Sequence, residues 1–121
     1  MDLPPEPASA GRARAFVADM LEVWDCNDTE EIAGLLTSEV VTNAVRHAGG
    51  DLVLEVSLQA STLRISTLDR GPMWTQPIPA DPHDSHGRGL LLVDSLARRW
   101  GVEQRATGKT VWFEVAVQPR R

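Results

Sequence analysis

A carboxylate and a carboxamide one helical turn apart are the residues of this chain best suited to chemistry. Glu39 and Asn43 lie in the segment 39–48, whose pattern is typical of the end of an amphipathic helix. Residues four apart on a helix are neighbours on one face. Burying this pair beside the apolar Leu36 and Val40 would be costly without a partner. Two oxygen-bearing groups on a rigid element suit a hard cation such as Mg²⁺ and the phosphates that it carries.

Two further motifs are candidates to meet this pair in space. The segment Asp69–Gly71 stands at the end of an expected strand, and the segment Gly87–Leu90 stands at the start of an expected helix. A carboxylate can accept a hydrogen bond from an exocyclic amine such as adenine N6. Glycines let backbone N–H groups approach an anion, and a helix N-terminus adds a partial positive charge. Each motif is common alone, so the prediction of a shared site depends on their order and spacing.

Periodicity predicts the elements that must position these motifs. Apolar residues repeat with helical spacing in two long stretches; Ser9 is the expected N-cap of the first, and Asp28 with Glu31 forms a capping box for the second. Alternation of apolar and polar residues then predicts antiparallel strands. The expected elements are helices 9–24, 29–47 and 90–99 and strands 52–59, 63–69, around 102 and 110–117.

This order of elements predicts one domain with a two-layer α/β (α+β) sandwich. We expect a mixed, mostly antiparallel sheet of about four or five strands with about three helices on one face. Residues 1–8, which contain Pro4, Pro5 and Pro7, are expected to be a flexible lead-in to a domain over 9–118. The stretch 70–88 holds four of the eight prolines and no clear period. A loop of this length in a small domain is often a functional lid, and plain disorder is the alternative.

Composition narrows the possible functions. The net charge is −5 and no run of Lys or Arg exceeds two residues, which argues against binding to nucleic acid or to an anionic membrane. No apolar run reaches the length of a membrane span. Cys26 is the only cysteine, and its neighbours Asp25 and Asp28 disfavour a reactive thiolate. The simplest expectation is a soluble cytoplasmic protein.

The motifs, taken in order, resemble the GHKL-type ATPase/kinase domain, a histidine-kinase-like ATPase with the Bergerat-type fold that DNA gyrase, histidine kinases and MutL share. Within that group the chain is most similar to the anti-sigma factor serine/threonine kinase family. The resemblance covers about residues 10–117. The matching segments are Ser38–Ala48, Asp69–Gly71, Gly87–Asp94 and the closing strand Gly108–Phe113.

The resemblance implies ATP and Mg²⁺ as cofactors and assigns a role to each matching residue. Asn43 would bind Mg²⁺, Glu39 would be the general base, and Asp69 would recognise the adenine amine. Where the family often has a second glycine, this chain has Met73, which is expected to pack on the adenine face. The other residues expected at the nucleotide are Gly71 at the base, Gly87 and Gly89 at the phosphates, Leu90 beside them, and Thr110 in the water network beside Asp69. Arg88 is expected either to contact a phosphate or to be simply exposed.

By resemblance, the protein is an ATP-dependent anti-sigma factor and protein serine/threonine kinase. It would bind a sigma factor, phosphorylate a serine of an anti-sigma factor antagonist and form a homodimer, with no direct contact to nucleic acid or membrane. One alternative is a nucleotide-gated protein-binding regulator without significant kinase activity; another is a detached histidine-kinase catalytic domain. Taken without the other motifs, Glu39 and Asn43 could instead be a solvated helix face, with Arg46 paired to Glu39. Lys109 is assigned to a turn, with contact to a phosphate as the lesser possibility.

Overall fold

The fold is a five-stranded sheet with three helices, seen in a computed structural model that describes residues 1–47, 50–69, 88–105 and 108–117. The strands run in the order β1-β2-β3-β5-β4, and every ladder between them is antiparallel. The α/β sandwich expected from the sequence is therefore confirmed. Its strands are β1 (Asp2–Leu3), β2 (Leu52–Gln59), β3 (Thr62–Asp69), β4 (Arg99–Arg105) and β5 (Gly108–Ala116). Its helices are α1 (Ala8–Val23), α2 (Glu30–His47) and α3 (Arg88–Leu96), with a 3-10 turn at Asn27–Thr29.

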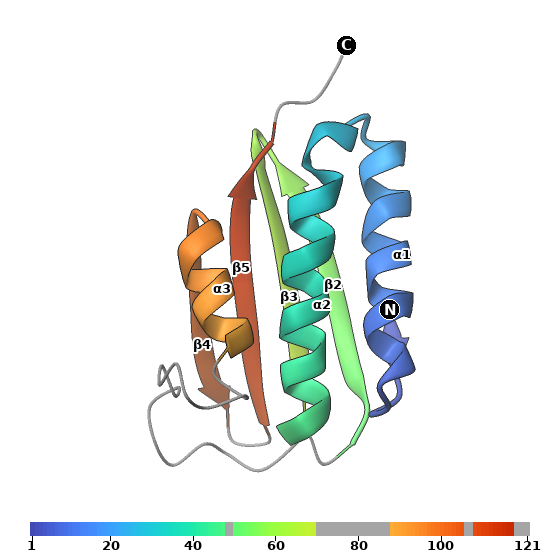
Figure 1. Cartoon of the computed structure of the whole chain (residues 1–121), viewed down its shortest axis with the longest axis vertical. Helices are drawn as coiled ribbons and strands as arrows, with labels where there is room; N and C mark the ends of the chain where they lie inside the picture. The colour runs from blue at the N-terminus through green and yellow to red at the C-terminus, as the bar shows by residue number, and fades with distance from the viewer. Residues whose placement is uncertain (48–49, 70–87, 106–107, 118–121) are drawn as a thin grey trace.

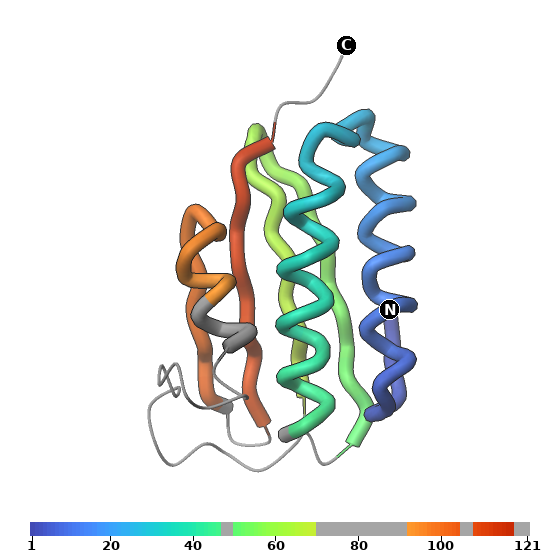
Figure 2. Tube along the Cα trace, in the orientation of Figure 1, coloured from blue at the N-terminus to red at the C-terminus, as the bar shows by residue number. Residues whose placement is uncertain are grey.

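All three helices cover the same face of the sheet, as Figures 1 and 2 show. Helix α2 packs between α1 and α3 and also contacts β3. The core lies between the two layers, where side chains such as Leu36, Ile65 and Phe113 have no exposed surface. Burial of this apolar area is the main stabilising contribution to the fold.

Strand alternation divides the sheet residues between a helix-covered face and an open face. In an antiparallel ladder, residues directly opposite each other point to the same side, and successive residues point to opposite sides. On β3, Ile65 is opposite Phe113 and belongs to the core, whereas Arg64 is opposite Glu114 and belongs to the open face. The two faces of β3 and β5 therefore carry different side chains, and each position can be assigned from the register.

The first residues of the chain differ from the expected flexible lead-in. Asp2–Leu3 pairs with β2 as an edge strand, and Leu3 is buried in the core. The terminal ammonium of Met1 donates a hydrogen bond to the carbonyl of Leu54 at 2.9 Å. The expectation for residues 1–8 is wrong here because Leu3 gains apolar burial and β2 gains backbone partners, both of which favour an ordered segment.

The sequence predicts Ser9 as the N-cap of the first helix, and the structure shows that this prediction is wrong. Helix α1 begins at Ala8 with Pro7 as its N-cap residue, and no side chain provides a capping hydrogen bond there. The hydroxyl of Ser9 instead donates to the carbonyl of Pro4 at 2.6 Å, and Ser9 is buried. Its polar group thus holds the segment between β1 and α1 against the helix.

The third helix is shorter at its end than the periodicity predicts. It stops at Leu96, and β4 begins at Arg99, so Arg99 lies on a strand rather than on the helix. The indole N–H of Trp100 donates to Oδ1 of Asp94 at 2.7 Å. Pairing with β5 favours a strand here, because the ladder supplies partners for the backbone N–H and C=O groups of this segment. In a longer helix, the last C=O groups would have no partner within the helix.

Cys26 is buried, as befits a structural residue. Burial raises the pKa of its thiol, and the charges of Asp25 and Asp28 raise that pKa further. The thiol donates to the carbonyl of Trp24 at 3.3 Å. Among the helices of the described residues, none is long and apolar enough to cross a membrane.

Candidate functional site

Four elements bring their ends together at one end of the molecule, the lower end in Figure 1. These are the C-terminal ends of α2 and β3, the start of β5 and the start of α3. Helix α2 contacts both α3 and β3, and β3 is hydrogen-bonded to β5 along its length. The predicted motifs at Asn43, Asp69 and Gly89 lie on these ends, so chain segments far apart in sequence meet in one region.

Asn43 lies on the buried side of α2. Its exposed fraction is 5%, and its Oδ1 atom has no hydrogen-bond partner among the residues that the structure describes. Glu39, one turn earlier, is half-buried. A solvated helix face is therefore excluded for Asn43. A buried acceptor without a partner costs about 1–3 kcal/mol, so this oxygen calls for a ligand that would satisfy it.

Asp69 and Lys109 form an ion pair inside the protein. They stand directly opposite each other on β3 and β5, and Nζ of Lys109 lies 3.0 Å from Oδ2 of Asp69. Neither side chain has exposed surface. The prediction that Lys109 belongs to a turn is wrong. Alternation along β5 was the signal that could have found it, because Lys109 shares its side of the strand with the apolar Val111 and Phe113.

Thr110 does not lie where the resemblance placed it. The register sets Thr110 opposite Leu68, one residue out of step with Asp69. Because successive residues of a strand point to opposite faces, the side chain of Thr110 belongs to the open face and that of Asp69 to the helix-covered face. The expectation that Thr110 joins a network beside Asp69 is corrected accordingly, and Lys109 takes that place.

Some of the remaining predicted residues lie on α3, and the others lie outside the residues that the structure describes. Arg88, Gly89 and Leu90 form the first turn of α3, so the helix begins two residues earlier than predicted. The first backbone N–H groups of a helix have no partner within it and favour anions. Of the expected lid over 70–88, residues 70–87 lie outside the described residues, and they include Gly71, Met73 and Gly87.

These positions fit a nucleotide and its metal in chemical terms. The amide oxygen of Asn43 is a hard ligand, the carboxylate of Asp69 is an acceptor for an amine, and the first turn of α3 is suited to phosphate. Among the described residues, no group of three or more His, Cys, Asp or Glu could form a metal cage. Mg²⁺ is commonly bound by one or two carboxylates together with water and substrate phosphates, so a site with few protein ligands is compatible with this ion.

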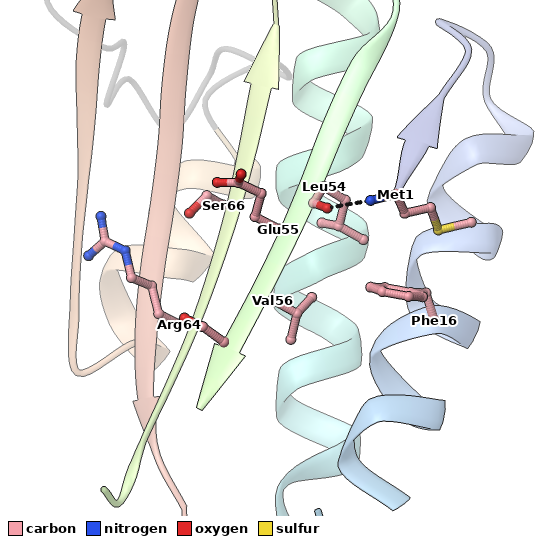
Figure 3. A pocket seen from close by; sticks show the side chains of 8 residues that line it. Met1, Phe16, Leu54, Glu55, Val56, Arg64 and Ser66 are labelled. Atoms are coloured by element: carbon pink, nitrogen blue, oxygen red, sulfur yellow. Dashed lines mark hydrogen bonds between the residues drawn. The ribbon is translucent and has the colours of Figure 1, made fainter. Parts of the chain in front are cut away.

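A separate hollow of about 480 Å³ lies at the edge of β2, away from this region (Figure 3). It is lined by Met1 and Phe16 on the helix side and by Glu55, Arg64 and Ser66 on the open side. None of the predicted site residues contributes to its wall. It is therefore a different feature from the site described above.

Residues 3–115 match the family described as the histidine kinase-like ATPase domain. An uncharacterised protein of Streptomyces coelicolor is 36% identical over 87 residues, which cover 68% of this chain and 83% of that protein.

Solved structures of histidine kinases have the same fold. The histidine kinase domain of a blue-light activated kinase from Erythrobacter litoralis aligns over 94% of this chain with a TM-score of 0.59 and 22% identity. The catalytic domain of the histidine kinase ThkA aligns over 88% of both chains with a TM-score of 0.61 and 15% identity. This chain spans 61% of that Erythrobacter domain and 41% of a second structure of the blue-light kinase. At these identities the ThkA and Erythrobacter domain comparisons show the fold alone.

Proposed function

The chain belongs to the histidine kinase-like ATPase domain family, and on that premise we propose that it is an anti-sigma-factor-type protein serine/threonine kinase. Membership in the family implies an ATP-binding domain with kinase or ATPase chemistry. The proposal adds Mg²⁺, a serine of an anti-sigma factor antagonist as the phosphoryl acceptor, and a sigma factor as a bound partner. A homodimer is part of the same proposal.

The buried oxygen of Asn43 is the observation that supports this proposal best. It has no hydrogen-bond partner among the described residues, and it lies one helical turn from Glu39 on α2, the helix that contacts both β3 and α3. A purely structural helix would gain stability from an apolar side chain at this position. A magnesium ion carrying phosphates would satisfy the oxygen, and the first turn of α3 would face the same phosphates.

Glu39 supplies the group that the transfer needs. Its carboxylate is half-buried, so a protein substrate can reach it. In the proposed step, the serine hydroxyl of the antagonist gives its proton to Glu39 as its oxygen bonds to the γ-phosphorus. The bond between that phosphorus and ADP then breaks. The demands of such a transfer are positioning and charge neutralisation, which the acidic residue and the metal-binding amide provide.

Calorimetric titration with ATP, with and without Mg²⁺, tests the nucleotide premise. We expect ATP to bind in the presence of Mg²⁺ and to bind at least about tenfold more weakly without it, because a charge-assisted contact contributes about 1.5–3 kcal/mol. ATP binding that does not respond to Mg²⁺ would remove the metal from the proposal. No binding under either condition would overturn the ATP site itself.

Incubation with γ-labelled ATP and candidate antagonists tests the kinase. Acid-stable label on a serine supports the proposal, and Glu39→Ala should then retain ATP binding while the transfer rate falls by about 100-fold or more. Binding without transfer to any antagonist would favour a nucleotide-gated regulator instead. Acid-labile label on a histidine would identify a detached histidine-kinase catalytic domain.

A further inference from the structure

Lys109 places a positive charge at the end of the molecule where the nucleotide is proposed to bind, and the functions considered so far leave it unused. Its ammonium nitrogen lies 3.0 Å from Oδ2 of Asp69, and both side chains are fully buried. It stands where the resemblance predicted a threonine of the nucleotide site, since Thr110 belongs to the opposite face. The carboxylate expected to recognise the base therefore has a cation at its side.

Stability alone is a weak reason for such a pair. Two charges removed from water lose much of their solvation, and replacing a buried ion pair with apolar residues of similar volume is often neutral or stabilising. The neighbours of the pair on the same face, Leu52 and Val111, are buried apolar residues that an apolar replacement would extend. A functional reason for retaining both charges is consequently the stronger explanation.

We propose that Lys109 binds N1 of adenine beside the contact to the amine that the resemblance assigns to Asp69, so that the two side chains together recognise the Watson–Crick edge of the base. An ammonium group has three donors, so Lys109 can keep one on Asp69 and direct another to N1 of the base. The carboxylate has several acceptor positions, so Asp69 can accept from the amine at N6 while it holds Lys109. Adenine presents this acceptor and this donor side by side, as the protein presents its donor and acceptor 3.0 Å apart. The inference rests on the proposed ATP site.

This pairing makes the site selective at two positions of the base. Inosine triphosphate carries an oxygen acceptor at position 6 and an N–H donor at position 1, the reverse of adenine. The oxygen would face the carboxylate of Asp69, and the N–H would face the ammonium of Lys109. A buried site built to hydrogen-bond one pattern rejects the reversed pattern strongly, because its own polar groups lose their partners.

Nucleotide analogues test the contact on the unmodified protein. Affinities for ATP, 1-deaza-ATP, 7-deaza-ATP and inosine triphosphate are measured by calorimetry with Mg²⁺. We expect 1-deaza-ATP, which lacks the N1 acceptor, to bind about tenfold or more weakly than ATP, and inosine triphosphate to bind more weakly still. The 7-deaza analogue, altered on the far side of the amine, should bind within about threefold of ATP.

The variant Lys109→Met assigns the effect to the side chain, with Arg64→Met on the opposite face as the matched control. In Lys109→Met the preference for ATP over 1-deaza-ATP should fall to within about threefold, whereas Arg64→Met should keep the full preference. Because the wild-type series needs no variant, it decides the question even if Lys109→Met does not fold.

Four results would overturn the inference, and the first three separate it from the proposed function. Equal binding of ATP and 1-deaza-ATP to the wild-type protein would remove Lys109 from the base and leave the ATP site standing. The same would follow from an equal loss with the 7-deaza analogue, or from full discrimination in Lys109→Met. Absence of any ATP binding would overturn the site and this inference together.

Discussion

The β3–β5 ladder carries two cross-strand ion pairs that have the same geometry and opposite surroundings. Arg64 and Glu114 stand directly opposite each other with a 3.1 Å contact, and Asp69 and Lys109 do so with a 3.0 Å contact. The first pair lies on the open face, where 36% of the Arg64 side chain is exposed. The second lies on the helix-covered face, where both side chains are fully buried. Distance alone does not say what an ion pair contributes.

The open-face pair belongs to a cluster in which the contacts are redundant. Glu114 accepts hydrogen bonds from Nη1 of Arg64 at 3.1 Å and from Nη2 of Arg99 at 2.8 Å. The guanidinium of Arg64 also lies over the ring of Trp112, 4.1 Å from its centroid. Water screens the two partly exposed arginines, although only 10% of the Glu114 side chain is exposed, and a second arginine can replace the first. Buried Lys109 and Asp69 are shielded from such screening, so loss of either one is expected to matter far more.

Removing one partner from each ion pair should give the largest difference in the free energy of unfolding. Lys109→Met leaves a carboxylate in the core, so we expect the free energy of unfolding to fall by about 3–5 kcal/mol. Arg64→Met leaves Glu114 with Arg99, so we expect a loss below about 1 kcal/mol. Urea unfolding monitored by circular dichroism measures both.

A double variant sharpens this first prediction. Asp69→Leu combined with Lys109→Met removes both buried charges and should restore most of the lost stability. If the double variant is as unstable as Lys109→Met, the cost comes from lost packing rather than from an uncompensated charge. The difference in stability between the two pairs would then come from the volume of the side chains that is lost and not from their charge.

Asn43→Ala tests whether the helix-covered end binds a ligand. We expect Mg²⁺-dependent ATP affinity to fall at least about tenfold. The free energy of unfolding should not fall by more than about 0.5 kcal/mol, because the change removes a buried acceptor that has no partner among the described residues. Calorimetry and urea unfolding provide the two readouts. Ser66→Ala, on the open face, is the control and should change neither. A variant that loses more stability than this while its ATP affinity is unchanged would make Asn43 a structural residue.

Gly101→Ala probes the packing of the open-face cluster. A Cβ atom at position 101 would lie 2.9 Å from Cζ2 of Trp112, closer than the two groups can approach. The indole must shift from its place beside Arg64, and we expect a loss of about 1 kcal/mol in urea unfolding. Gly11→Ala is the matched control, because a Cβ there meets nothing within 4 Å and α1 should gain about 0.5–1 kcal/mol. Equal effects of the two changes would contradict the close contact.

The pH dependence of stability should reveal the smallest effect. The hydrogen bonds from Arg99 and then Arg64 lower the pKa of Glu114, while its burial opposes them. A carboxyl whose pKa is lower in the folded state stabilises the fold above its unfolded pKa of about 4.3, and this contribution is lost as pH falls through the lowered value. Unfolding midpoints in urea between about pH 6 and pH 3 should therefore decline less in Glu114→Gln than in wild type. Parallel declines would mean that other carboxyls dominate.

Local pattern was sufficient to predict most of the elements. The spans of β2 and α2 agree with their predictions closely, because alternation and helical spacing are local properties of the chain. The prediction failed where another segment decides the state of a residue. Leu3 is ordered because it is buried and β2 offers pairing, and Arg99 is on a strand because β5 pairs with it.

The sequence by itself determined the family, the layered fold and the positions of Asn43 and Asp69 at the ends of a helix and a strand. It did so because motifs and periodicities are written in residues close together along the chain. Only the tertiary structure decided that Asn43 is buried with an unsatisfied oxygen, that Thr110 belongs to the open face, and that Lys109 meets Asp69. Those facts depend on the register between β3 and β5 and on how α2 packs, and a shift of one residue in that register would exchange Lys109 for Thr110.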